Sequence, residues 1–411
     1  MGKKLAIDKG LRNLINKYFF ELCMVVVLAA AVFIRVSLLP NTDLSPDYET
    51  YYKAWVEHYR QYGLVKGLES APGDYYVPFN IIYWLCSLLP VEPWLPLGII
   101  PGIFEAISAF FIYKIFYLLT GRRHHSVFAG ILTLFLPFVV FNGALWKQVD
   151  AVYTCFLVIS LYHLLKENYR WAFVFYGIAF AFKLQAIIFL PILVILYLTE
   201  GYATYSKVSK DDSDKKSFSI LEFLWIPAIY LIAGLPEVLC RHGIRATYLA
   251  YFDQAGELSS EGYGMVSYFP NLYNWGFDDY DALLSKAAIL LLLVVLVFIA
   301  FVCYRYRDAM DRSMVVYLAI WVGMTCLMLL PGMHERYDYA VLLILTPYAI
   351  LSRKQIIWPM ILVNLCSLAC YGRALFRADI IPMYIVTFAY AVAYFWITVD
   401  VLGILAAKRR D

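Results

Sequence analysis

The sequence predicts an all-α protein that crosses a membrane many times. Of its 411 residues, 62% are hydrophobic and only 16% are charged, whereas a soluble domain is about half apolar and about a quarter charged. Apolar runs that could each cross a bilayer recur along the chain, and Lys and Arg concentrate in alternate connecting segments. We therefore expect a polytopic membrane protein with about twelve transmembrane helices, some of them short or broken, and with both termini in the cytoplasm.

The first of these spans is expected at residues 18–39. The stretch is long enough to cross a bilayer, which takes about 20 residues, and it carries Arg35 near its far end. Several Lys and Arg residues precede it and should remain in the cytoplasm. The run lacks a small-residue cleavage site, so we expect an uncleaved anchor whose far end emerges on the outer face.

The long apolar run at 171–200 decides the predicted topology. Lys183 and Gln185 interrupt it, and we expect two short spans that meet there in an outer turn. With this split, the cytoplasmic segments hold 21 Lys and Arg residues and the outer segments hold 11. A single span over the whole run would invert every later loop and remove this bias, so the split is favoured.

The chain is expected to form one integral membrane unit over residues 1–411. Its parts are a first span at 18–39, an outer loop at 40–95, a helical module at 96–239, a second outer loop at 240–284 and C-terminal spans at 285–411. The polar segment 206–217 fits a solvated linker. The second outer loop is rich in aromatic residues and Gly, and it either closes over a ligand or packs on its own side chains.

Composition and spacing exclude several classes of function. The eight cysteines fall mainly inside apolar runs with neither disulfide nor zinc spacing, so no metal site is predicted. The sequence has no Gly-rich phosphate loop and no patterned basic surface, so we expect no nucleotide or nucleic-acid partner. The expected partner is the lipid bilayer, and the remaining candidates for chemistry are polar residues at the outer ends of the spans.

The first outer loop begins with a helix-start signal. Ser45 fits an N-cap and Pro46 the first helical position, which places Asp47 near the positive end of the helix dipole. Aromatic residues then recur at the spacing of an amphipathic helix in the membrane interface: Tyr48, Tyr51, Tyr52, Trp55, Tyr59 and Tyr62. Asp47 either only opens this helix or acts as a base that takes a proton from an acceptor hydroxyl.

Further polar residues gather at the same outer face. Glu105 lies about two turns into the second span, where it serves either a functional site or an ion pair with Lys or Arg. Three outer turns carry the others: Gln148 and Asp150 in WKQVD, Lys183 and Gln185 in FKLQ, and His334, Glu335 and Arg336 in PGMHERYDY. Each turn alone could be a capped helix end, but together they place carboxylates and cations on one face.

These residue types suit the displacement of a phosphate. Arg336 can bind a phosphate through two parallel hydrogen bonds, and Lys183 can act as a point charge. With Asp47 as the base, a hydroxyl could attack a sugar carried on a polyprenyl phosphate in one inverting step. Such a reaction requires no metal and no cofactor other than the lipid-linked sugar, which is a donor substrate.

The same motifs resemble a known family. They are Asp47-Tyr48, Trp55, Gly63 and Gly73-Asp74-Tyr75 with Pro78 in the first outer loop, then Trp146 to Asp150, Phe182 to Ile187 and Met333 to Tyr337. The chain resembles the membrane-embedded glycosyltransferases of the GT-C fold that use lipid phosphosugars. It is most similar to a bacterial group related to the second GPI mannosyltransferase. It departs from that group at Lys147, where the group has Gly, and at Glu105, where Asp is common.

The resemblance implies a GT-C-type helical bundle and an inverting hexosyltransferase with Asp47 as the general base. The hexose would be mannose, glucose or galactose, and the acceptor a glycan, a lipid or a protein. The site would face outward from a bacterial cytoplasmic membrane. Residues that bind the donor phosphate or the substrates would be Trp55, Glu105, Gln148, Asp150, Lys183, Gln185, His334, Glu335 and Arg336.

Two other functions fit parts of the pattern. A lipid-linked-sugar flippase or a secondary transporter would also have interrupted spans and buried charges. A catalytically silent scaffold of a glycosylation complex would need no base at all. We find no inverted repeat in the sequence, and the polar residues gather at one face of the membrane, so the transferase is the leading hypothesis.

Overall fold

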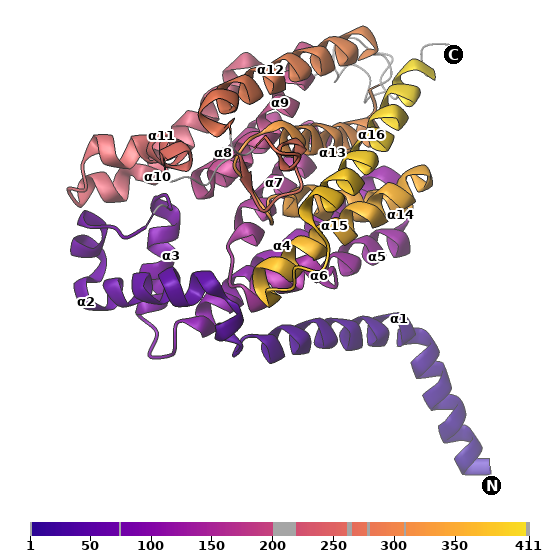
Figure 1. Cartoon of the computed structure of the whole chain (residues 1–411). Coiled ribbons are helices and arrows are strands. Elements are labelled where there is room, and N and C mark those ends of the chain that lie inside the picture. The colour runs from indigo at the N-terminus through magenta and orange to yellow at the C-terminus, as the bar shows by residue number, and fades with distance from the viewer. Residues whose placement is uncertain are drawn as a thin grey trace.

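The computed structural model describes residues 2–73, 75–199, 219–260, 265–277, 280–307 and 310–407. Over these residues the protein is helical apart from one short sheet and the connecting turns, which confirms the all-α prediction (Figure 1). Asp74, the predicted linker at 206–217 and parts of the second outer loop lie outside the described residues.

Seven of the described helices are long and apolar enough to cross a membrane. They are α1 (Gly2–Leu38), α4 (Trp94–Thr120), α10 (Trp225–Leu239), α12 (Asp281–Arg305), α13 (Arg312–Leu329), α15 (Ile357–Phe376) and α16 (Met383–Ala407). A bent pair, α5 (Arg123–Leu134) followed by α6 (Pro137–Val140) and the π-helix η3 (Phe141–Leu145), would raise the number to eight. These helices are those of a polytopic membrane protein.

The described residues also form shorter apolar helices. They are α3 (Val77–Ser87), α7 (Asp150–Leu165), α8 (Tyr169–Phe182), the 3-10 helix η4 (Leu184–Phe189) with α9 (Leu190–Leu198), and α14 (Tyr339–Leu351). The predicted break in the run at 171–200 is confirmed, because α8 ends at Phe182 and Lys183 has an extended backbone with φ −153° and ψ 130°.

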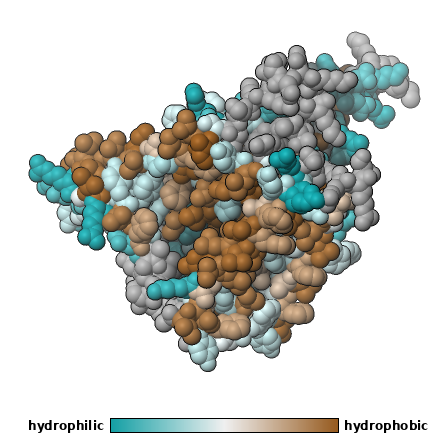
Figure 2. Space-filling view, turned by 90° about the horizontal axis from the view of Figure 1, so that it is seen from above, coloured by the Kyte–Doolittle hydropathy of each residue, from teal (hydrophilic) through white to brown (hydrophobic). Residues whose placement is uncertain are grey.

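The core of the protein lies around α13, α7 and α14. These three helices are apolar on nearly every side and are buried over most of their length, as expected for helices surrounded by other helices. In contrast, α1 leaves the bundle and exposes apolar side chains along most of its length (Figure 1). Hydrophobic residues also cover the middle of the face shown in Figure 2. Such surfaces suit contact with lipid.

Helices of the two outer loops lie on one side of the molecule, and the C-terminal end of α16 lies on the opposite side (Figure 1). They are α2 (Lys53–Glu69), α3 and α11 (Ile244–Ser260). The predicted helix of the first outer loop is present as α2, with Val56 and Tyr59 buried and Tyr62 exposed. It bends at Gly63, whose φ of 68° lies in the left-handed region that Gly adopts most easily.

Two local features position the candidate site. Strand β1 (Val266–Ser267) pairs in parallel with β2 (Met333–His334), which joins the second outer loop to the PGMHERYDY turn. The π-helix η2 (Tyr48–Tyr52) directly follows Asp47, and the π-helix η3 directly precedes the WKQVD turn. Segments of π-helix are rare and often occur at functional sites.

Candidate active site

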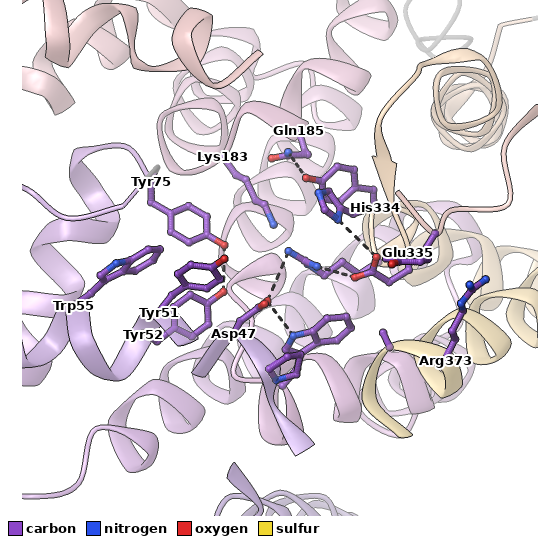
Figure 3. A pocket seen from close by; sticks show the side chains of 16 residues that line it. Asp47, Tyr51, Tyr52, Trp55, Tyr75, Lys183, Gln185, His334, Glu335 and Arg373 are labelled. Carbon is purple, nitrogen blue, oxygen red and sulfur yellow. Dashed lines mark hydrogen bonds and ion pairs between the residues drawn. The ribbon is translucent and has the colours of Figure 1, made fainter. Parts of the chain in front are cut away.

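A cavity of about 530 Å³ lies between the first outer loop and the turns at Lys183 and at Met333 to Tyr337 (Figure 3). Its volume is in the range of small-molecule sites, roughly 300–1,000 Å³. The lining includes seven residues predicted for the site: Asp47, Trp55, Lys183, Gln185, His334, Glu335 and Arg336. The structure therefore brings side chains from three separate segments to one cavity.

Asp47 presents one carboxylate oxygen to the protein and the other to the cavity. Oδ2 accepts hydrogen bonds from Trp146 Nε1 at 3.0 Å and from Gln148 Nε2, and it lies 3.9 Å from Arg336 Nη2. Within the described part of the chain, no donor reaches Oδ1. The side chain is 23% exposed. Asp47 is thus held in place through one oxygen while the other is available to a ligand.

The start of the helix that carries Asp47 is fixed by Ser45. The Ser45 Oγ accepts a hydrogen bond from the Tyr48 backbone N–H at 3.3 Å, which confirms the predicted N-cap. The same hydroxyl donates to the Trp146 carbonyl at 2.6 Å. This buried residue therefore ties the first outer loop to the WKQVD turn, whose side chains contact the Asp47 carboxylate.

Arg336 lies at the centre of three carboxylates. Its Nη1 is 2.8 Å from Glu335 Oε1, its Nε is 3.4 Å from Asp150 Oδ2, and its Nη2 is 3.9 Å from Asp47. The guanidinium also lies over the Trp146 ring, with 5.0 Å between its central carbon and the ring centroid. A planar guanidinium can serve several acceptors at once in a fixed geometry, so Arg336 sets the relative positions of the acidic groups.

Behind Arg336, Asp150 and Lys183 form a buried ion pair with 2.5 Å between Lys183 Nζ and Asp150 Oδ1. Asp150 is the first residue of α7, and its Oδ2 also accepts a hydrogen bond from Asn142 Nδ2 at 2.9 Å. Asp150 therefore contacts Lys183, Asn142 and Arg336 and lies beneath the cavity lining. It joins the WKQVD, FKLQ and PGMHERYDY turns.

His334 and Glu335 form the next part of the wall. His334 Nδ1 lies 3.6 Å from Glu335 Oε2, and the backbone of His334 pairs with the second outer loop. Burial alone would raise the pKa of Glu335, but its hydrogen bond with His334 and the charge of Arg336 lower that pKa to about 2. Glu335 is therefore an anion at neutral pH.

Aromatic side chains make up the side of the cavity beyond Asp47 (Figure 3). Tyr52 and Tyr75 share a hydrogen bond of 3.2 Å between their hydroxyls, and the Trp55 ring meets Tyr75 edge-on with centroids 5.7 Å apart. Tyr51 also lines this side. Aromatic faces with nearby hydroxyls can pack on the apolar side of a sugar ring while binding its polar edge.

Two predicted site residues lie just behind the lining and one lies apart from it. Gln148 and Asp150 reach the site through Asp47 and Arg336. Glu105, in contrast, is buried between α1 and α4, where its Oε2 is 2.6 Å from Arg35 Nε. Arg35 also donates to the Leu134 carbonyl at 3.0 Å. The geometry favours the ion-pair role for Glu105, because Arg35 on α1 engages one oxygen of this α4 carboxylate. The other oxygen, Oε1, is buried and has no hydrogen-bond partner among the described residues.

Further residues of the cavity wall include Trp146, Tyr268 and Arg373. Tyr268 comes from the second outer loop and lies over the Arg373 guanidinium, 4.9 Å from the ring centroid to its central carbon. Trp146 belongs to the predicted WKQVD motif, but no local sequence pattern predicts its hydrogen bond to Asp47. The signal for Arg373 is weak: it is a cation at the outer end of an apolar run.

Comparisons with known proteins identify no relative. No protein-family model matches the chain. No curated protein matches it either. The function must therefore be argued from the geometry of the site.

Proposed function

We propose that this protein is an inverting glycosyltransferase that moves a hexose from a polyprenyl phosphate to an acceptor hydroxyl at the outer face of the cell membrane. One observation carries the proposal. A carboxylate with one engaged and one available oxygen shares a cavity with Arg336, Lys183 and Arg373. This pairing of a base with cations matches a reaction that removes a proton from one substrate and releases a phosphate from the other.

In the proposed step, Asp47 Oδ1 takes the proton of the acceptor hydroxyl. The freed oxygen attacks the anomeric carbon of the hexose, and a new C–O bond forms as the bond to the phosphate oxygen breaks. The electron pair of that bond leaves with the polyprenyl phosphate. Arg336 and Arg373 stabilise the charge that develops on the phosphate, and Lys183 acts with Asp150 to hold Arg336 in position.

The proposal includes the architecture and the setting. A GT-C-type bundle with about twelve spans would count the short helices such as α7, α8 and α14 together with the long ones. The outward orientation rests on the distribution of Lys and Arg in the sequence. The acceptor would be a glycan, a lipid or a protein with a free hydroxyl, and the setting a bacterial cytoplasmic membrane.

The test is sugar transfer by the purified protein in detergent or liposomes. Polyprenyl-phosphate mannose, glucose and galactose are supplied with a panel of acceptors, and products are identified by mass spectrometry. We expect transfer from one donor, and its loss by a factor of about 10³ or more in Asp47→Asn with unchanged thermal unfolding. Unchanged transfer in Asp47→Asn would remove Asp47 from the mechanism.

A flippase or transporter gives the opposite result. Movement of a lipid-linked sugar across liposomes should largely survive the Asp47→Asn change, because that change keeps the size of the side chain and one oxygen that can accept from Trp146 and Gln148. Transport by the wild-type protein without any product of sugar transfer would replace the proposed function with this alternative.

A further inference from the structure

A second, smaller pocket lies on the other side of Tyr75 from Asp47. It measures about 150 Å³, several times the roughly 10–15 Å³ that a single water needs on this measure. The loop between α2 and α3 forms one wall and α11 the other. Tyr75 lines both this pocket and the larger cavity, so the two spaces share this residue.

Asn80 and Glu237 form the floor of the pocket, and both are buried. Asn80 Nδ2 donates to Glu237 Oε1 at 2.9 Å and to the Tyr75 carbonyl at 3.3 Å. Its donors are therefore in use. Asn80 Oδ1, in contrast, is a buried acceptor with no hydrogen-bond partner among the described residues. A buried amide oxygen without a donor is costly, so a ligand that supplies one would be favoured.

The other polar side chains of the pocket are His242 and two acids. His242 Nδ1 is 3.1 Å from the Glu69 carbonyl, and its Nε2 is 4.0 Å from Glu237 Oε2. Glu237 and Asp253 add carboxylates. An anionic ligand would meet carboxylates there, whereas a neutral or cationic group with several N–H or O–H donors would satisfy them.

We infer that this pocket is a subsite for a donor-rich head group of the acceptor, either a polyol such as a sugar or an amine-bearing group. The inference rests on the proposed function, because it assigns the pocket to the substrate whose hydroxyl Asp47 deprotonates. The acceptor would lie across Tyr75, with its head group on Asn80 and the reacting hydroxyl in the larger cavity. The subsite selects acceptors whose head group carries no negative charge.

The first test is steady-state kinetics of a variant that fills the pocket. Ala246 lies on α11 at the wall, and Ala246→Phe places a ring in the space. We expect the acceptor KM to rise about tenfold or more, the loss of roughly one or two hydrogen bonds. The donor KM and the slow hydrolysis of the donor by water should stay within about twofold. Ile244→Phe is the matched control, because Ile244 is exposed on the same helix and does not line the pocket.

Glu237→Gln and Asp253→Asn test the charge preference. Both keep the size of the side chain, so acceptors with an added carboxylate, such as a uronic acid, should become better substrates relative to neutral ones. An unchanged acceptor KM in Ala246→Phe, or an equal preference for anionic acceptors in the wild-type protein, would overturn the subsite.

Direct binding separates this inference from the proposed function. Saturation-transfer NMR with inositol, glucosamine, ethanolamine and glucuronate needs no turnover. Wild-type protein should bind at least one of the first three, and Ala246→Phe should not. Inositol binding identifies a polyol site and ethanolamine binding an amine site. If the wild-type protein binds one of these ligands but transfers no sugar, only the proposed reaction is wrong. If it transfers sugar but binds none of them, only the subsite is wrong.

Discussion

The guanidinium of Arg336 lies 3.9 Å from the carboxylate of Asp47, and both side chains line one cavity. The two residues belong to distant parts of the sequence, one in the first outer loop and one in the turn before α14. A reaction that uses a base and releases a phosphate requires a carboxylate and a cation this close together.

Arg336→Lys should lower the rate of sugar transfer by a factor of about 10² or more. A single ammonium group cannot reproduce the contacts of the guanidinium with Glu335, Asp150 and Asp47. The measurement is kcat for transfer, with thermal unfolding in detergent to show that the variant folds. Arg60→Lys is the control, because Arg60 pairs with Glu57 at the surface. Equal kcat values for the two variants would contradict the role of Arg336.

Lys183→Met should destabilise the protein by about 3–5 kcal/mol, because it leaves Asp150 as a buried charge with one partner fewer. Adding Asp150→Asn should recover part of that loss, so the two changes should be strongly non-additive. Midpoints of thermal unfolding of the two single variants and the double variant give the coupling. The exposed pair Arg60–Glu57 should show a coupling below about 1 kcal/mol. Additive effects at Lys183 and Asp150 would show that the ion pair is unimportant.

The stability of the protein should depend on Glu335 at acid pH. The folded-state pKa of Glu335 is lowered to about 2 from an ordinary value of 4.5. Its contribution is therefore fully present above pH 4.5 and is lost as the pH falls toward 2. Unfolding midpoints measured from pH 6 to pH 2.5 should fall more steeply for the wild-type protein than for Glu335→Gln. Parallel curves would mean that Glu335 is not held as an anion.

Gly73→Ala should destabilise the first outer loop and displace Trp55. Gly73 has a φ of 76°, and a Cβ there would overlap the Trp55 indole. Gly63→Ala is the control: Gly63 has a φ of 68° and a ψ of −170° with open space around its Cβ position, so the change carries a backbone cost without a side-chain overlap. We expect a larger loss of stability and a larger rise in donor KM for Gly73→Ala. Equal effects of the two changes would rule out the contact with Trp55.

Lys147→Gly should give a more stable protein than Lys147→Ala, by about 1 kcal/mol. Lys147 has a φ of 61°, in the left-handed region where Gly has no steric cost and Ala does. Both variants lose the hydrogen bond from Lys147 Nζ to the Leu145 carbonyl, so their difference isolates the backbone. Thermal unfolding of the pair is the measurement. Equal midpoints would show that the turn adopts another conformation in the variants.

Local signals in the sequence were enough to predict much of the fold. Apolar runs predicted helices, the polar side chains of Lys183 and Gln185 predicted the break after α8, and Ser45-Pro46 predicted the start of the helix that bears Asp47. Each of these features depends on neighbouring residues alone. The sequence also pointed to the three outer turns, because polar side chains are costly inside a membrane.

Contacts between distant segments could not be predicted in the same way. The pairing of Glu105 with Arg35 depends on how α1 crosses α4, and the placement of Tyr268 depends on the pairing of β1 with β2. Neither follows from periodicity. The place of Arg373 in the cavity wall was not predicted either, because it depends on how α15 packs against the other helices. In the sequence, a cation at the end of an apolar run is ordinary.

The unequal surroundings of the two Asp47 oxygens have a stereochemical consequence. Since Trp146, Gln148 and Arg336 all meet Oδ2, the side chain cannot rotate to exchange its oxygens without losing these contacts. A substrate arriving in the site would find the proton-accepting lone pairs already aimed in a single direction. Under the proposed mechanism, the base would therefore take the proton of one particular acceptor hydroxyl, and this selectivity would be set before a substrate binds.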